Sequence, residues 1–125
     1  MIGRIIGIDP GKSTGLCVFD DGEMIYGKEA HSAEEVIDFI DEYDPDLVVM
    51  EDFIVSRRPS NAKEPIKVIG VVEFHCRKKG IKIDLQSPSV LTLMMKRADG
   101  LHGSIHVRSS CAHVLYNIEK RKMCK

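Results

Sequence analysis

The stretch GIDPGKSTG, residues 7–15, decides which of two folds this chain adopts. Its Gly-Lys-Ser triplet is the ending of a Walker A loop, G-x-x-x-x-G-K-[ST], whose backbone N–H groups curl around a phosphate. Such a loop needs its first glycine five positions before Gly11, but Ile6 stands there and Gly7 is one residue too close. A loop shortened by one residue cannot wrap a phosphate in the same way. The spacing therefore predicts no nucleotide cofactor and directs attention to Asp9, which precedes the triplet.

The segment after this stretch indicates strands, whereas a Walker A loop would be followed by a helix. Residues 14–27, TGLCVFDDGEMIYG, alternate apolar and polar side chains around the turn at Asp21-Gly22. Asp-Gly supplies the positive φ angles of a tight turn between two strands. The glycines of the opening stretch therefore serve a strand–turn–strand unit.

The rest of the chain alternates apolar strands with amphipathic helices. Besides the hairpin, apolar runs predict strands at 4–9, 46–51 and 81–86, and helical periodicity predicts helices at 31–43, 65–79, 89–97 and 104–122. A hairpin followed by strand–helix crossovers gives a mixed sheet with helices on its faces. We therefore predict an α/β fold with a five-stranded mixed sheet, in one domain that spans residues 1–125.

Local signals support these helices. Ser32 and Glu35 have the spacing of a capping box, Pro65 falls in a first turn, and Gly80 follows a helix end. In the last helix, four residues are predicted to share one apolar face: Ile105, Ala112, Leu115 and Tyr116.

The charge of the chain is unevenly distributed. The net charge of −1 over 125 residues hides −12 across residues 20–52 and +8 across residues 77–125. A basic second half suits a polyanion-binding face, and it equally suits solvated helix faces.

The composition also bears on the compartment. No run of 18 apolar residues is present, and no signal-peptide pattern is found at the start, so we expect neither a membrane span nor secretion. The four cysteines are then most simply reduced thiols of a cytoplasmic protein. A zinc site remains an alternative, but its spacing fits no usual pattern; it would draw on Cys76, His102, His106, Cys111 and His113.

Two carboxylates end the two central apolar strands. Asp9 ends the strand at 4–9, and Glu51 ends the strand at 46–51. A right-handed helical crossover would make these strands parallel neighbours, so that both carboxylates meet at one edge of the sheet. Like charges that close persist mainly by holding a cation, and oxygen ligands select Mg²⁺ or Mn²⁺. Asp9 alone would instead be interpreted as a turn residue, because Asp-Pro-Gly favours a turn.

Four segments together resemble the RuvC-like Holliday-junction resolvases, especially the short phage-encoded kind. They are IIGIDPGKSTGLCVFDDG, DLVVMEDF, EPIKVIGVVEFHCRKKGIKIDLQSPS and HVRSSCAHVLY, in the family's order over nearly the whole chain. The resemblance implies a ribonuclease H-like fold, two Mg²⁺ (or Mn²⁺) ions in each active site, and a homodimer acting on four-way DNA junctions. It also implies a protein of the cytoplasm of an infected or host bacterial cell.

The resemblance assigns the site residues one by one. Asp9 matches the family aspartate that bridges both metals, and Glu51 matches the glutamate that ends the fourth strand. The family's last helix carries H-x-R-D-A-x-x-H in the phage kind, so His106 and His113 fit their positions. His106 is expected to orient or deprotonate the attacking water, or to bind a metal.

Ser109 stands where the family has an aspartate, which reduces the negative charge of the expected site. Three explanations stay open. The chain is a natural weak or inactive relative, the residue has been changed deliberately to trap substrate, or another carboxylate substitutes for the aspartate. Asp52 and Asp99 are the nearest candidates for such a substitute, and Asp52 is expected to point away from Glu51.

Several cations are candidates for phosphate contacts, because most protein–DNA hydrogen bonds go to the sugar-phosphate backbone. They are Lys12, Arg57, Arg58, Lys63, Lys67 and Arg108. Phe53 is either a residue that stacks on an unpaired base or a buried core residue.

A junction with near two-fold symmetry calls for a two-fold homodimer with two active sites. The resemblance places the dimer contact on the helix at 64–79, where four apolar residues serve either the contact or the core: Ile66, Ile69, Val72 and Phe74. The sequence thus predicts a metal-dependent endonuclease that nicks Holliday junctions and other branched DNA symmetrically. Two alternatives remain: a branched-DNA-binding protein that does not cut, and a YqgF-like nuclease acting on RNA.

Overall fold

The computed structural model describes residues 3–52, 63–101 and 103–123, except the side chains of residues 92, 122 and 123. Five strands and four helices follow one another in these ranges, and each begins and ends within two residues of its prediction. They are β1 (Arg4–Asp9), β2 (Thr14–Asp20), β3 (Glu23–Ala30), α1 (Ala33–Tyr43), β4 (Leu47–Glu51), α2 (Lys63–Lys79), β5 (Lys82–Gln86), α3 (Val90–Ala98) and α4 (Ile105–Met123).

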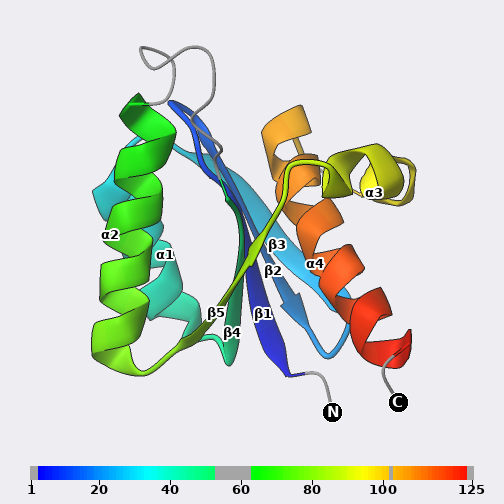
Figure 1. Ribbon diagram of the computed structural model, residues 1–125, viewed down its shortest axis with the longest axis horizontal. Coiled ribbons are helices and arrows are strands. Elements are labelled where there is room, and N and C mark those ends of the chain that lie inside the picture. The colour runs from blue at the N-terminus through cyan, green and yellow to red at the C-terminus, as the bar shows by residue number, and fades with distance from the viewer. Residues whose placement is uncertain (1–2, 53–62, 102, 124–125) are drawn as a thin grey trace.

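The strands form one mixed sheet in the order β3-β2-β1-β4-β5 (Figure 1). β1, β2 and β3 form an antiparallel meander, whereas β4 pairs parallel to β1, and β5 pairs parallel to β4. Helices α1 and α2 cover one face of the sheet, and α3 and α4 lie on the other (Figure 1). The predicted α/β fold with a five-stranded mixed sheet flanked by helices is confirmed.

The hairpin between β2 and β3 turns as its sequence predicts. Asp21 and Gly22 both have positive φ angles, 52° and 92°, as a tight two-residue hairpin turn requires. The cap of α1 is also confirmed, since the Ser32 hydroxyl accepts a hydrogen bond of 3.2 Å from the Glu35 backbone N–H.

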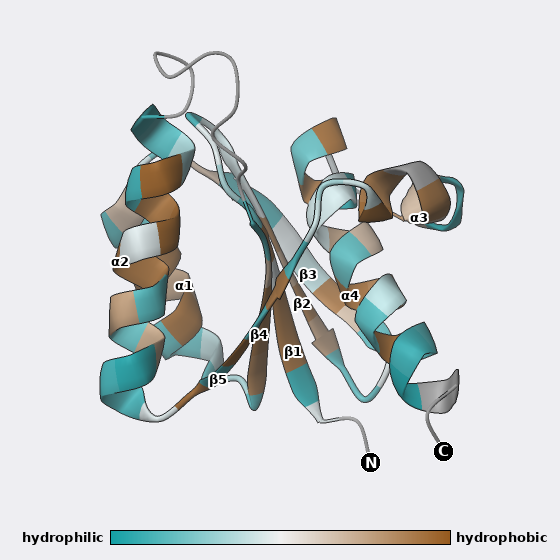
Figure 2. Ribbon diagram, in the orientation of Figure 1, coloured by the Kyte–Doolittle hydropathy of each residue, from teal (hydrophilic) through white to brown (hydrophobic). Residues whose placement is uncertain are grey.

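Alternate side chains of the strands divide the core into two layers. Ile6 and Ile8 of β1 pack with residues of α1 and α2, while Ile5 packs with residues of α3 and α4. The central strands are accordingly hydrophobic along most of their length (Figure 2). Because this alternation has a period of two, it also fixes the face onto which each strand-end residue projects.

Helix α2 is only partly buried. Val72 is buried in the layer beneath α2, and Ile69 packs against that layer. Ile66 and Phe74 are exposed, and Phe74 keeps 65% of its surface accessible. Of the four residues predicted for either core or dimer contact, two therefore serve the core and two are exposed, and the dimer contact stays a prediction.

The predicted apolar face of the last helix is wrong in one respect. Ile105 is 60% exposed, whereas Val107, Cys111 and Val114 are the residues that pack in the layer under α4. The reason is that Ile105 begins α4 on the side opposite Val107 and Val114, whereas α3 packs against the later turns and helps to bury Ala112.

The zinc alternative finds no support in the described ranges. Cys76 belongs to the layer of α1 and α2, while Cys111 belongs to the layer of α3 and α4, so the sheet separates them. His102 lies outside the described residues. None of the helices in the described ranges combines the length and apolar character that a membrane crossing requires.

Candidate active site

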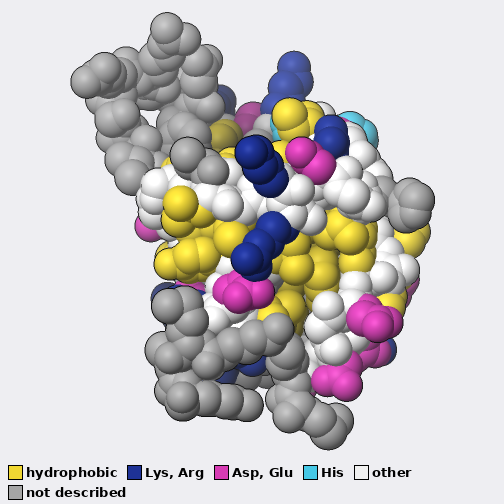
Figure 3. All heavy atoms as spheres, turned by 90° about the vertical axis from the view of Figure 1, so that its right-hand side faces the viewer, with side chains coloured by type: hydrophobic (Ala, Val, Ile, Leu, Met, Phe, Trp, Pro, Cys, Tyr) yellow, Lys and Arg dark blue, Asp and Glu magenta, His cyan; other side chains and the backbone are white. Residues whose placement is uncertain are grey.

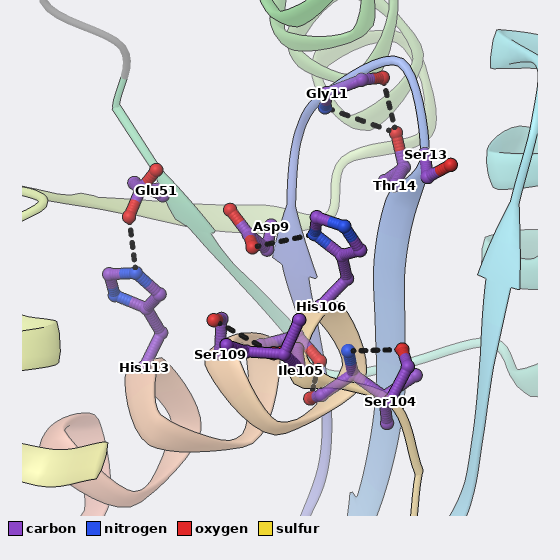
Figure 4. Close-up of polar contacts among 12 residues, drawn as sticks. Asp9, Gly11, Ser13, Thr14, Glu51, Ser104, Ile105, His106, Ser109 and His113 are labelled. Carbon is purple, nitrogen blue, oxygen red and sulfur yellow. Dashed lines mark hydrogen bonds and ion pairs between the residues drawn. The ribbon is translucent and has the colours of Figure 1, made fainter.

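Asp9 and Glu51 lie side by side at one end of the sheet. β1 and β4 are parallel and in register from Ile5–Leu47 to Ile8–Met50, so the next residue of each strand is one of the two acids. Ile8 and Met50 project toward α1 and α2, and the acids therefore project toward α4. Figure 4 shows Asp9 facing His106 in the first turn of that helix and Glu51 facing His113 further along it. Both carboxylates are largely buried, with side-chain exposures of 14% and 12%.

The pKa of the Asp9 carboxyl group is shifted by its burial beside Glu51. Burial, followed by the negative charge of Glu51, raises the pKa of Asp9 from 3.8 to about 7. His113 and His106 oppose this rise, and a hydrogen bond with Glu51 adds to it. Near neutral pH the pair thus favours a shared proton or a cation between the two acids.

Two glycines let α4 lie close enough to reach these acids. A Cβ atom on Gly15 would overlap the backbone carbonyl of His106 and stand 2.9 Å from the Val107 nitrogen. A Cβ atom on Gly7 would overlap the Ser110 carbonyl and stand 2.8 Å from the Cys17 sulfur. Because Gly7 of β1 and Gly15 of β2 have no side chains, the first two turns of α4 can pack directly on the backbone of these strands.

His106 uses this close approach to face Asp9. Its Nδ1 lies 3.9 Å from Asp9 Oδ2, and its side chain is 47% exposed. The predicted neighbourhood of Asp9, Glu51 and His106 is thus present, with the imidazole at the solvent side of the acids (Figure 4). This position lets His106 exchange protons with solvent while it faces a buried carboxylate.

A second imidazole, not among the predicted catalytic residues, contacts Glu51. His113 is fully buried, and its Nε2 lies 3.1 Å from Glu51 Oε1. Its other ring nitrogen, Nδ1, lies 2.8 Å from Oε1 of the buried Gln86 at the end of β5. The sequence held a signal for both residues: His113 is seven positions, or two helical turns, after His106, and Gln86 ends a strand as Glu51 does.

Ser109 lies on α4 between the two histidines (Figure 4). Its hydroxyl donates a 2.9 Å hydrogen bond to the backbone carbonyl of Ile105 and approaches the sulfur of Met95 at 4.0 Å. The side chain is 7% exposed. The hydroxyl is thus bonded to its own helix, one turn earlier.

The two acids considered as substitutes for the expected aspartate lie elsewhere. Asp99 follows α3 and is 61% exposed, with Oδ1 3.6 Å from the Arg108 guanidinium. Asp52 is exposed, and its backbone N–H donates to the Gln86 carbonyl. Among the described acids, Asp9 and Glu51 are therefore the two that meet under α4.

The predicted phosphate contacts are only partly placed. Lys12, Lys63 and Lys67 are exposed. Lys12 and Lys67 line an open groove of about 660 Å³ between the turn after β1, the start of α1 and α2. Arg108 is directed to Asp99 instead. Arg57, Arg58 and Phe53 lie outside the described residues.

The basic second half of the chain does not form one continuous positive face in the described ranges. Arg97 pairs with Glu119 at 2.8 Å, and Lys120 Nζ lies 3.7 Å from Asp84. On the face of α3 and α4, hydrophobic and acidic side chains separate the cations (Figure 3). These pairs favour solvated helix faces over a dedicated polyanion surface for these residues.

The chemistry of the carboxylate pair suits a hard cation. Two adjacent carboxylates whose charges raise a pKa supply the oxygen ligands and the negative charge that Mg²⁺ or Mn²⁺ binds. In the described ranges, however, no cluster of three or more His, Cys, Asp or Glu side chains gathers as a ready metal site. The residues therefore fit one divalent ion on Asp9 and Glu51, whereas Ser109 offers a second ion no charge.

The fold, a five-stranded mixed sheet flanked by helices, is shared with solved structures of Holliday junction resolvases, and it is the ribonuclease H-like fold that the resemblance implied. The chain resembles Thermus thermophilus RuvC solved with a Holliday junction substrate, with a TM-score of 0.81 and 16% identity over 97% of this chain and 96% of that one. It also resembles the Fowlpox virus resolvase solved with junction DNA, with a TM-score of 0.66 and 13% identity over 93% of this chain and 99% of that one.

A third similar structure is the yeast mitochondrial Holliday junction resolvase, with a TM-score of 0.58 and 10% identity over 90% of this chain and 77% of that one. No family model and no curated protein sequence matches the chain. At these identities the likeness establishes the fold, and the activity is inferred from the site.

Proposed function

We propose that this chain is a metal-dependent endonuclease that nicks Holliday junctions and other branched DNA symmetrically. The observation that carries the proposal is the Asp9–Glu51 pair at the ends of β1 and β4, with His106 beside it at 3.9 Å. Its support is the fold shared with three junction resolvases. Activity in this chain is weakened by Ser109, which replaces an expected acid.

In the proposed mechanism Asp9 and Glu51 would hold Mg²⁺ or Mn²⁺ at the carboxyl ends of β1 and β4. When bound, two such ions supply water activation near neutral pH and charge stabilisation at the leaving 3′ oxygen. His106 is placed to orient the attacking water or to accept its proton, because its imidazole is half exposed beside Asp9. Burial of the two acids strengthens their attraction for a cation.

Ser109 is the weak point of this site. A hydroxyl bonded to the Ile105 carbonyl adds no negative charge, so the affinity for a second ion is reduced. The alternative function, a branched-DNA-binding protein that does not cut, is favoured by this same observation. The two functions differ only in the rate of hydrolysis, which a cleavage assay measures directly.

DNA binding is proposed to involve the cations that surround the site. Lys12 follows β1, and Lys63 and Lys67 lie in the first turns of α2, beside the end of the sheet that carries the acids (Figure 1). Arg57 and Arg58 remain sequence predictions for the same role. Binding through such contacts weakens steeply with salt, because each neutralised phosphate releases counterions.

A homodimer is proposed through the exposed side of α2. Ile66, Val71 and Phe74 are exposed there. Val71 and Phe74, three residues apart, lie on one apolar stripe, and Ile66 extends it about two turns before Phe74. Pairing this stripe with its two-fold copy would bury apolar surface and hold two active sites at a fixed separation, as symmetric paired nicks require.

The test is single-turnover cleavage of labelled four-way DNA, linear duplex and structured RNA in Mg²⁺ or Mn²⁺. Wild-type protein is expected to cut the junction slowly and the other two substrates less. Asp9→Asn should abolish cutting while junction binding stays equal or strengthens, because one negative charge beside the phosphate is removed. Asp38→Asn, which removes an exposed carboxylate of α1, serves as the matched control and should cut like wild type.

Three results would contradict the proposal. Metal-dependent cutting that persists in Asp9→Asn would remove Asp9 from the site. Preferential cutting of structured RNA would support the YqgF-like alternative. Tight junction binding with no cutting by wild type or by Ser109→Asp would support the binding-only alternative.

A further inference from the structure

A buried chain of three polar side chains joins β4, β5 and α4 beside the proposed metal site. Glu51 and Gln86 end adjacent parallel strands and are paired in register. His113 bridges them from α4, with 3.1 Å to Glu51 Oε1 and 2.8 Å to Gln86 Oε1. Gln86 and His113 are both almost completely buried, so each is fixed by its surroundings.

The direction of these hydrogen bonds follows from their partners. If Gln86 presents its carbonyl, Nδ1–H of His113 donates to it, and Nε2 and Glu51 Oε1 share one proton in their hydrogen bond. If the amide is turned over, its NH₂ donates to Nδ1, and Nε2–H still donates to Glu51. The remaining tautomer would set the lone pair of Nε2 against an ionised carboxylate. Each favourable arrangement therefore commits Glu51 Oε1 to the imidazole of His113.

We infer that His113 and Gln86 are positioning residues, a clamp that holds Glu51 by one oxygen and leaves its other oxygen for the ion shared with Asp9. Without the clamp, repulsion from Asp9 would swing the flexible Glu51 side chain away from the pair. The buried amide nitrogen of Gln86 has no hydrogen-bond partner among the described residues, so the contact with His113 is the hydrogen bond that holds the Gln86 side chain in place. The clamp deepens the proposed function and rests on it.

The clamp matters more in this chain than it would with a third acid. Ser109 contributes no charge, so metal binding depends on the geometry of two carboxylates alone. Partners that orient a metal-binding carboxylate typically change metal affinity by about 10–100-fold when they are removed. The prediction is therefore a change in affinity for the metal, measurable without DNA.

The test compares two amides at position 113. In His113→Gln the side-chain amide reaches the place of Nε2 and can still donate to Glu51. In His113→Asn the amide reaches only the place of Nδ1, so the contact with Glu51 is lost. Mn²⁺ affinity is measured by calorimetry on the whole chain without DNA, and thermal unfolding is recorded for each variant. His75→Asn, on the face of α2 that contacts Asp41, is the control.

We expect His113→Asn to bind Mn²⁺ about 10–100-fold more weakly, His113→Gln to stay within about threefold of wild type, and the two to unfold at similar temperatures. His75→Asn should bind Mn²⁺ like wild type. Equal affinity in His113→Asn and wild type overturns the clamp. The clamp is also overturned if His113→Asn and His113→Gln lose the same Mn²⁺ affinity and both unfold at a lower temperature, because lost packing would then explain the weaker binding.

Two further variants separate a failure of the clamp from a failure of the proposed metal site. Gln86→Leu retains the imidazole and nearly the same volume, so it should fold and still weaken Mn²⁺ binding by about threefold or more; wild-type affinity in that variant overturns the clamp. Asp9→Asn tests the metal site itself. Loss of Mn²⁺ in Asp9→Asn with no loss in His113→Asn overturns the clamp alone, whereas no loss in Asp9→Asn overturns the proposed metal site together with the clamp.

Discussion

A methyl group added at Gly15 should separate helix α4 from the sheet. The added Cβ would overlap the His106 carbonyl and stand 2.9 Å from the Val107 nitrogen, and these are backbone atoms that no rotamer change can move away. Because non-bonded carbon atoms pack best at about 3.5–4.0 Å, relief of this overlap requires the first turn of α4 to shift by roughly 1–2 Å. His106 would shift with it, away from an Asp9 contact that is already 3.9 Å long.

The expected size of the effect differs for stability and for activity. Overpacking of this kind costs about 1–3 kcal/mol, or roughly 3–15 °C in the unfolding temperature of a chain of this size. Misplacement of a catalytic group by about 1 Å costs about a hundredfold in rate. Gly15→Ala should therefore remain folded at 25 °C while it loses most of its junction cleavage.

The assay pairs thermal unfolding with single-turnover cleavage at saturating Mn²⁺. The matched control is Gly100→Ala, since a Cβ on Gly100 would meet nothing within 4 Å and its φ is not positive. This control should unfold at or slightly above the wild-type temperature and cut at the wild-type rate. Wild-type cleavage by Gly15→Ala would show that α4 does not need its close approach to β2, and the reasoning would be refuted.

Three other changes test separate parts of the proposal. The pKa of Asp9 is raised to about 7, so its charged form destabilises the metal-free protein above pH 7 and not below about pH 4. Asp9→Asn should therefore raise the free energy of unfolding at pH 8, by at most about 4 kcal/mol, and change it little at pH 4. Urea titrations at both pH values measure this difference. Added Mg²⁺ at pH 8 should stabilise wild type and not this variant. Ser109→Asp should speed junction cutting by roughly a hundredfold, because a charge for the second ion is restored, and an unchanged rate would mean that position 109 is not the missing ligand. Phe74→Glu should convert the dimer to monomer in sedimentation, while Leu93→Glu, an equally exposed apolar residue on α3, should not; a dimer in both would place the interface elsewhere.

Much of this site follows from alternation along two strands. Asp9 and Glu51 each follow an apolar run, and a period of two is enough to predict that they share a face once the strands are parallel. The same rule correctly separates Asp52 from Glu51. Local signals of this kind are strong because they depend on neighbours in the chain.

The residues that the sequence could not place depend on contacts between distant elements. Nothing near Gln86 indicates that its amide meets His113, because that contact depends on the depth at which α4 packs on the sheet. The error at Ile105 has the same origin, since helical periodicity does not reveal that two sides of α4 are covered, one by the sheet and one by α3, and that Ile105 lies outside both. The close approach at Gly15 is likewise invisible in a stretch whose glycines suggest only a turn.

The order of the site residues along the chain has a consequence for when activity arises. Asp9 belongs to the first strand, whereas His106 and His113 belong to the last described helix, so the two halves of the site are separated by most of the sequence. During synthesis the hairpin and β4 emerge first, and the sheet can begin to form around a pair of acids that has no imidazole beside it. If the chain has the proposed function, its site is complete only when α4 docks on the sheet, because a chain without α4 would hold the two acids with neither imidazole beside them.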